Sequence, residues 1–237
     1  MHSSALINLE NFFSVYLKNF ENPKILDFGS RSLSDQIGAK ILLKKMNIKH
    51  EYTGVDIEKG NNVDIVLKDP YSFKEITESS YDVIISTSVF EHVEFFWLTY
   101  LEILRILKPN GILYFNVPSN GNFHRWPKDC WRFYPDSSNA LINWAKRNNF
   151  NPILLESFVS NQYLECGWND YVSITLKDES YIDNFNEKII YTYKKFINGI
   201  DHNNKLYNFS YKSEDHRNWG YRLWYRVRKK IDKLKRS

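Results

Sequence analysis

Short apolar runs alternate with amphipathic segments along the first two thirds of the chain. Apolar residues at three- and four-residue steps predict helices, and short apolar runs that end at glycine or polar residues predict strands. Helices are expected at 5–20, 34–46, 95–107 and 136–147, the last with Asp136 as its N-cap. Strands are expected at 24–28, 52–56, 63–67, 81–86 and 112–117. The strand at 81–86 is apolar on both faces, which is typical of a central strand in a parallel sheet.

This alternation of strands and helices predicts an α/β fold with a doubly wound, mostly parallel central sheet flanked by helices. Two late strands, 153–160 and 171–176, are expected to form a hairpin that closes the sheet. From residue 179 onward the pattern is polar and helical. We therefore expect one domain over 1–178 and a helical extension over 179–237.

Composition narrows the classes of protein that fit. The 237 residues are 43% hydrophobic and 16% aromatic, which suits a globular domain and excludes a disordered chain. Cys130 and Cys166 are far apart and form no CxxC clip, so a reducing compartment such as the cytoplasm is expected, and no metal site is predicted. No secretory signal is recognisable, and no stretch approaches the ~18 apolar residues that span a bilayer.

Polar residues follow every predicted strand, and ligands bind at the carboxyl ends of the strands in an open parallel sheet. Asp27 and Gly29 end the first strand, and Asp56 ends the second. A carboxylate at the tip of the second strand can accept two hydrogen bonds from a ribose diol. The alternative for Asp56 is an ordinary carboxylate in a surface turn.

Four motifs occur in order: Ile25-Leu-Asp-Phe-Gly29, Gly54-Val-Asp-Ile57, Tyr81 through Val93, and Ile103 through Gly111. With them, residues 24–150 resemble the class I S-adenosylmethionine-dependent methyltransferases. The resemblance implies a Rossmann-like fold, S-adenosyl-L-methionine as cofactor and methyltransferase activity. It also implies roles for residues that match the motifs: Asp27 and Gly29 on the methionine side, Asp56 on the ribose, Ile57 and Asp69 at the adenine, and Ser86 and Thr87 beside the sulfonium. Ser30 is expected to bind the cofactor as well.

The first loop departs from the family pattern, because Arg31 and Leu33 stand where further glycines are usual. One hypothesis is that Arg31 pairs with the carboxylate of the cofactor, and the alternative is that it points to solvent. The departure also supports a second functional hypothesis, a cofactor-binding partner subunit without catalysis. A nicotinamide dehydrogenase is disfavoured, because the G-x-G-x-x-G turn after the first strand is missing.

Methyl transfer to a hydroxyl is helped by a general base, and histidine suits this role because its unperturbed pKa is ~6.5. The candidates are His92, after the fourth strand, and His124, after the fifth, with Asp129 as the group that orients His124. Which histidine is the base stays open at this point. In the alternative view, His92 is structural.

The segment 122–135 is dense in basic and aromatic residues where an acceptor would lie. It resembles a subset of these methyltransferases associated with bacterial surface-polysaccharide assembly, which implies a sugar, sugar-phosphate or nucleotide-sugar acceptor in capsule or lipopolysaccharide biosynthesis. Trp131, Phe133 and Tyr134 are expected to be structural, and Arg132 is either an anion-binding group or a structural clamp. The expected acceptor-binding residues are Glu91, Asn120, Arg125, Trp126, Lys128 and Arg132.

Charge is concentrated at the end of the chain. Residues 217–237 contain nine basic residues and one acidic residue, whereas the whole chain carries a net charge of only +4. Leucine, valine and isoleucine recur among these basic residues at helical spacing. The basic amphipathic helix is interpreted either as a contact with the inner face of the cytoplasmic membrane or as a helix that packs on the domain. Nucleic acid is disfavoured, because the rest of the chain is acidic.

Overall fold

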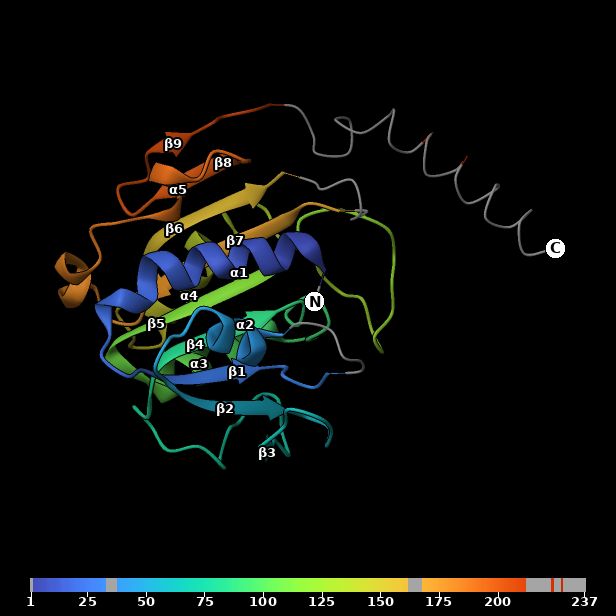
Figure 1. Ribbon diagram of the computed structural model, residues 1–237, viewed down its shortest axis with the longest axis vertical. Coiled ribbons are helices and arrows are strands. Elements are labelled where there is room, and N and C mark those ends of the chain that lie inside the picture. Colours follow the sequence, from blue (N-terminus) through green and yellow to red (C-terminus); the bar gives the residue numbers. More distant parts are fainter. Residues whose placement is uncertain (1, 33–37, 162–167, 212–222, 224–226, 228–237) are drawn as a thin grey trace.

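The computed structural model describes residues 2–32, 38–161, 168–211, 223 and 227. Its strands form one nine-stranded sheet in the order β3-β2-β1-β4-β5-β7-β6-β8-β9 (Figure 1). The strands are β1 (Lys24–Phe28), β2 (Glu51–Asp56), β3 (Ile65–Val66), β4 (Tyr81–Thr87), β5 (Leu107–Pro118), β6 (Ile153–Ser160), β7 (Asp170–Leu176), β8 (Phe196–Asp201) and β9 (Leu206–Tyr207).

Helices cover both faces of this sheet. They are α1 (Ser3–Tyr16), α2 (Ala39–Lys45), α3 (Phe96–Ile106), α4 (Ser137–Arg147) and α5 (Ile189–Thr192), with short 3-10 turns η1 (Leu17–Asn19) and η2 (Glu179–Asn184). One core cluster joins α1, α2 and α5 to the sheet, and a second joins α3 and α4 to the opposite face. Along β4, Val83 and Ile85 belong to the first cluster and Ile84 to the second, which explains why this strand is apolar on both faces.

The strand directions bring the carboxyl ends of the parallel strands to one edge of the sheet. Strands β1 to β5 pair in parallel, for example Ile25 with Val83, so their carboxyl ends lie at the same edge. Strand β7 runs antiparallel to β5 and pairs Asp170 with Pro118, so its amino end lies at that edge too. The strand order reverses between β1 and β4, and ligands bind at such a switch point.

The predicted doubly wound fold is confirmed, and so are the hairpin strands 153–160 and 171–176 as β6 and the body of β7. The expectation of a helical extension over 179–211 is met only by the short helical turns η2 and α5, and it is wrong for the residues that follow them. Strands β8 and β9 continue the sheet beyond β6, where β8 pairs with the backbone of β6 and buries Ile197 and Ile200. A strand there satisfies the backbone groups that β6 would otherwise leave exposed at an edge.

Three local predictions also need correction. The fifth strand begins at Leu107 rather than 112, because Leu107 already pairs with Tyr81 before a register shift. Asp136 occupies the N-cap position of α4 as predicted, but its side chain makes no capping hydrogen bond. Of the helix predicted at 34–46, the structure gives 39–45, and 34–37 lie outside the described residues.

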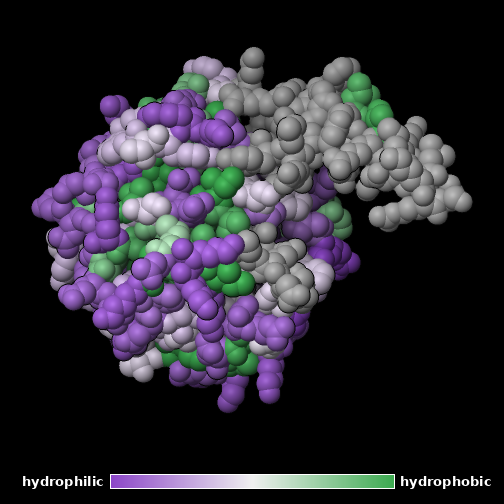
Figure 2. Space-filling model, in the orientation of Figure 1, coloured by the Kyte–Doolittle hydropathy of each residue, from purple (hydrophilic) through white to green (hydrophobic). Residues whose placement is uncertain are grey.

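The basic segment 217–237 lies outside the described residues except for Leu223 and Val227, whose side chains are 59% and 49% exposed. In the described part of the chain, none of the helices has the length and apolar character needed to cross a membrane. Hydrophilic residues dominate the face drawn in Figure 2, with hydrophobic residues visible near its middle.

A fully buried carboxylate holds α5 against the sheet and gives a stability prediction. Glu156 accepts hydrogen bonds from the Tyr16 hydroxyl at 2.6 Å and from the backbone N–H groups of Ile189 and Ile190 at 2.7 and 2.9 Å. Glu156→Ala leaves all three donors without an acceptor, so we expect a loss of about 3 kcal/mol in the free energy of unfolding, measured by urea denaturation. Glu156→Gln, which keeps an acceptor, is expected to lose less, and an equal loss would contradict this account.

Candidate active site

A cavity of about 670 Å³ opens at the carboxyl ends of β1, β2 and β4. Its lining includes most of the residues predicted to bind a cofactor: Asp27, Gly29, Ser30, Arg31, Asp56, Ile57 and Thr87. The strand order β2-β1-β4 brings these ends together, although the residues lie up to 60 positions apart in the sequence. The cavity therefore lies at the switch point where a ligand is expected.

Gly29 shapes the floor of this cavity. Its φ is +82°, and its N–H donates to the carbonyl of Val55 at 2.8 Å, which turns the chain sharply after β1. A Cβ atom at this position would lie 2.2 Å from Cγ2 of Val89. Only glycine combines the positive φ with this close approach.

Gly29→Ala is therefore expected to lower the free energy of unfolding by about 2 kcal/mol or more, because a positive φ and a steric overlap add together. Gly38→Ala is the matched control. Gly38 also lines the cavity, but a Cβ there meets nothing within 4 Å. The measurement is thermal unfolding of the two variants side by side. Equal midpoints would contradict the requirement for glycine at position 29.

Asp56 presents its carboxylate at the tip of β2. Its Oδ2 accepts from the backbone N–H of Arg31 at 3.2 Å, and its Oδ1 accepts from that of Glu58 at 3.0 Å. Partial burial raises the pKa of Asp56, while the backbone N–H groups of Arg31 and Ile57 and the nearby Arg31 charge act in the opposite direction. Each carboxylate oxygen keeps acceptor capacity beyond these hydrogen bonds, so the group can still accept from a diol.

Asp27 is a second acid in the cavity, and Tyr52 holds it. The Tyr52 hydroxyl donates to Oδ2 of Asp27 at 2.7 Å. Burial raises the pKa of Asp27 to about 6, and the negative charge of Asp56 adds to this shift. Tyr52 was not predicted as a site residue, because it precedes the strand end that the sequence singles out.

Arg31 lines the cavity, but its guanidinium forms an ion pair with Glu58, a residue that the sequence analysis did not single out. Asp69 and Ser86 do not line the cavity. Asp69 is exposed and accepts from the backbone N–H of Tyr71 at 2.8 Å. Ser86 is fully buried within β4, whereas its neighbour Thr87 faces the cavity.

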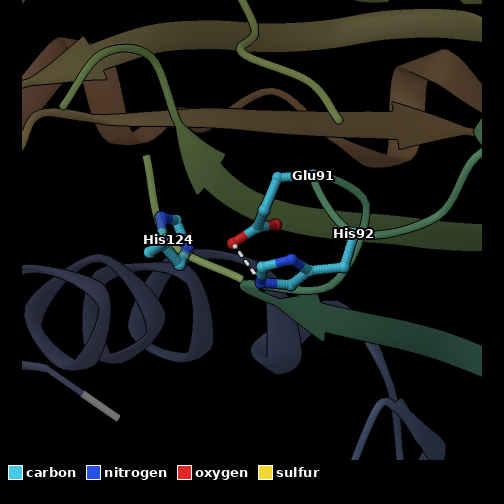
Figure 3. Close-up of side chains that lie close together, drawn as sticks. All are labelled: Glu91, His92 and His124. Carbon is cyan, nitrogen blue, oxygen red and sulfur yellow. Dashed lines mark ion pairs between the residues drawn. The ribbon is translucent and has the colours of Figure 1, made fainter. Parts of the chain in front are cut away.

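Glu91, His92 and His124 lie together beside this cavity (Figure 3). His92 lines the cavity, and its Nε2 lies 3.6 Å from Oε1 of Glu91. The ring centroids of His92 and His124 are 5.1 Å apart. Burial raises the pKa of Glu91 to about 8, and burial lowers the pKa of His92. The structure thus brings both predicted base candidates and a predicted acceptor-binding acid to one place.

Backbone hydrogen bonds hold the two segments that carry these residues. The N–H groups of Cys130 and Trp131 both donate to the carbonyl of Glu91, at 2.8 and 3.1 Å. The Nδ1 of His92 contacts the carbonyl of Lys128 in a short hydrogen bond. Since that carbonyl only accepts, Nδ1 carries the proton and Nε2 keeps its lone pair.

An ion pair orients His124 and its loop. Asp129 accepts from both terminal nitrogens of Arg132, at 2.5 and 2.8 Å, and from the backbone N–H of His124 at 2.7 Å. The Arg132 side chain holds the pKa of Asp129 well below its usual range. Arg132 also donates to the carbonyl of Asn122 at 3.1 Å, so it acts as the clamp that the sequence left as an alternative.

The other predicted acceptor-binding residues divide into two groups. Trp126 and Lys128 line the cavity. Asn120 does not, because its amide is paired with Asn169 through bonds of 2.7 and 3.1 Å. Arg125 also lies outside the lining, and its Nε donates to the carbonyl of Pro127 at 3.3 Å.

The expected structural role of three aromatic residues is confirmed only in part. Phe133 is buried in the core against Phe96, with ring centroids 5.0 Å apart. Trp131 is 37% exposed, and its indole N–H donates to the carbonyl of Val93 at 3.1 Å. Tyr134 is 58% exposed, so it is not a core residue.

Sequence reasoning missed three residues at this edge. Trp168 stacks on His124 with ring centroids 5.4 Å apart, and its indole nitrogen lies 3.2 Å from Nε2 of His2. His2 in turn contacts Asp170 at 3.1 Å. For Trp168 and Asp170 the available signal was the predicted hairpin. Its second strand runs antiparallel to β5, so its amino end lies at the same edge as the carboxyl ends of the parallel strands.

The family follows from the match of residues 5–155, well over half of the chain, to the family model described as a methyltransferase domain. The chain belongs to the methyltransferase domain family. A search of curated proteins gives no match to this methyltransferase.

Solved structures share the fold of this methyltransferase. A Burkholderia thailandensis 1,6-didemethyltoxoflavin N1-methyltransferase with bound S-adenosylhomocysteine is 14% identical, with a TM-score of 0.53 over 74% of this chain and 79% of the other. The methyltransferase domain of a citrinin polyketide synthase is 15% identical, with a TM-score of 0.53 over 73% of this chain but only 52% of the other.

A third structure, the [4+2]-cyclase SpnF, is 14% identical, with a TM-score of 0.52 over 73% of this chain and 81% of the other. SpnF is named for a cyclisation, so this likeness concerns the fold alone. For the methyltransferase described here, the acceptor has to be argued from the site.

Proposed function

We propose that this methyltransferase transfers a methyl group from S-adenosyl-L-methionine to a hydroxyl of a sugar, sugar phosphate or nucleotide sugar in bacterial capsule or lipopolysaccharide biosynthesis. The observation that carries the proposal is the continuity of the cavity. It extends from the Asp56 carboxylate at β2, past Gly29 and Thr87, to His92 of the Glu91, His92 and His124 cluster.

The chain's residues fit the cofactor. Asp56 keeps acceptor capacity for a ribose diol, and Ile57, 52% exposed, offers an apolar surface for a purine. Gly29 lines the cavity, and its positive φ and close approach to Val89 hold the turn after β1 that borders the methionine side. S-adenosyl-L-methionine supplies an activated methyl group on a sulfonium, which an aligned nucleophile attacks.

The protein's task on the acceptor side is to position a hydroxyl and to receive its proton. His92 has an unprotonated Nε2 because its Nδ1 binds the Lys128 carbonyl, and burial lowers its pKa, which keeps the ring neutral. His124 is held by Asp129 and Trp168. Either imidazole can accept the proton, so the cluster supports transfer to oxygen.

The acceptor class follows from the groups at the mouth of the cavity. Trp126 is 57% exposed and lines the cavity, and an exposed indole suits the apolar face of a sugar ring. Lys128 lines it too and carries a positive charge, although Glu94 pairs with it at 2.5 Å. The resemblance of 122–135 to methyltransferases of surface-polysaccharide assembly supports the same class.

A panel of sugars, sugar phosphates and nucleotide sugars, incubated with the protein and deuteromethyl-labelled cofactor, tests the proposal by mass spectrometry. The expected result is one labelled methyl group on the oxygen of a panel member. Transfer to nitrogen or carbon acceptors alone would contradict it. Cofactor binding without transfer to any acceptor would favour the partner subunit without catalysis.

The basic segment 217–237 is proposed as a peripheral membrane contact. Its nine basic residues favour an anionic surface, and Leu223 and Val227, the two described residues of the segment, are exposed. Partition onto phosphatidylglycerol vesicles is expected to exceed that onto phosphatidylcholine vesicles, and Arg226→Glu with Lys230→Glu is expected to weaken it. Equal partition of variant and parent would remove this contact.

A further inference from the structure

The Glu91 carboxylate is unusually placed for a surface-cleft acid. Its side chain is 1% exposed, and its Oε2 has no hydrogen-bond partner among the described residues. The charge of Arg132 acts on Glu91, but the Arg132 guanidinium is already bound to Asp129 through two nitrogens. A buried carboxylate with an unused oxygen is costly unless a positive group joins it.

Two imidazole nitrogens lie next to this carboxylate. Glu91, His92 and His124 each offer one ligand atom, and these atoms all lie within 4.8 Å of one another (Figure 3). Atoms bound to one cation at 2.0–2.2 Å lie roughly 3–4 Å apart, so the 3.6 Å between Glu91 Oε1 and His92 Nε2 already fits. Small side-chain rotations would close the widest pair.

The groups behind the two rings are those that usually orient metal-binding histidines. Nδ1 of His92 binds the carbonyl of Lys128, which leaves Nε2 to face Glu91. Nδ1 of His124 lies 3.3 Å from the carbonyl of Asn122, 3.5 Å from Oδ2 of Asp129 and 3.5 Å from Nη2 of Arg132, and these contacts leave its Nε2 available. A carbonyl or carboxylate on the far nitrogen fixes the tautomer and strengthens the ligand.

We propose that Glu91, His92 and His124 form a binding site for one divalent transition-metal ion, with Zn²⁺ as the best match. Two imidazoles and one carboxylate suit Zn²⁺ and its first-row neighbours, whereas Mg²⁺ and Ca²⁺ prefer oxygen ligands throughout. Three protein ligands leave a coordination position open, and His92 lines the cavity on that side.

The role of the ion, as distinct from its binding, rests on the proposed function. An acceptor hydroxyl at the open position would lose its proton more easily, since a bound cation stabilises the oxyanion. With the ion bound, His92 and His124 act as ligands instead of the proton acceptors described for the metal-free site, and the released proton passes to solvent.

Zinc binding to the full-length, untagged protein after chelator treatment tests the site. Calorimetry is expected to give one Zn²⁺ per chain, and Mg²⁺ is expected to bind far more weakly. Glu91→Gln and His124→Ala should each weaken Zn²⁺ at least tenfold. His50→Ala is the matched control, because His50 also bonds a carbonyl through Nδ1, at 2.7 Å from Ile48, and lies outside the cluster.

Two further measurements keep the outcomes separate. Co²⁺ added to the unaltered protein should give visible absorption bands typical of a site with four or five ligands. This result is expected even if the variants fail to fold. Titration with S-adenosyl-L-methionine in the metal-free protein tests the cofactor site alone. No stoichiometric Zn²⁺, or equal affinity in the parent and Glu91→Gln, overturns the metal site, and zinc without cofactor binding would overturn the proposed function instead.

Discussion

Asp56→Ala is expected to weaken the binding of S-adenosylhomocysteine by about 100-fold, measured by isothermal titration calorimetry. The carboxylate is held at the tip of β2 by two backbone N–H groups, at 3.0 and 3.2 Å, and its remaining lone pairs face the cavity. Hydrogen bonds to a charged acceptor contribute about 1.5–3 kcal/mol each, so the loss of two such bonds to a ribose diol gives an effect of at least this size.

Two variants sharpen this result. Asp56→Asn keeps the shape but loses the charge, so an intermediate affinity is expected. Asp69→Ala is the matched control, because Asp69 is exposed and lies outside the cavity lining, and its affinity is expected to equal that of the parent. If Asp69→Ala weakened binding as much as Asp56→Ala, the cavity would be wrongly assigned.

The second large effect is expected at the acceptor side. His124→Ala and His92→Ala should each lower kcat for methyl transfer by roughly 100-fold, the contribution typical of proton transfer to a positioned group. The affinity for S-adenosylhomocysteine should change little in His124→Ala, because His124 is not among the residues that line the cofactor cavity. This split between rate and affinity distinguishes a role in proton removal from general damage to the site.

His50→Ala again supplies the control, since His50 immediately precedes β2 and is not a member of the cluster. Full activity in His124→Ala would remove this histidine from the chemistry and leave His92 as the sole candidate. Loss of both activity and cofactor affinity in each variant would point to a structural role for the cluster.

The sequence predicted the parallel half of the fold well. Strand β1 was predicted with its observed bounds, and β4 within one residue, because their apolar runs are short and end in polar turns. Asp56 and Gly29 were found for the same reason, since local patterns mark the strand ends and the fold brings the ends together. These predictions needed only local information.

The remaining features depend on contacts between distant segments. Strand β8 pairs with β6, and β9 pairs with β8, so both depend on a sheet edge that exists only once β6 is in place. Their region of the sequence is polar, and it was interpreted as helical. The His124 site needs Trp168 and Asp129 as well as the hydrogen bonds from Cys130 and Trp131 to Glu91. Spacing along the chain does not encode such contacts. The two histidines were therefore predicted as base candidates, but the contact between their rings was not predicted.

The direct test of the central claim is a crystal structure of the protein with S-adenosylhomocysteine. The predicted result is the ligand in the cavity of about 670 Å³, with its ribose hydroxyls within hydrogen-bond distance of Asp56 and its sulfur on the side of His92. Ligand bound elsewhere, or with its ribose away from Asp56, would contradict the account.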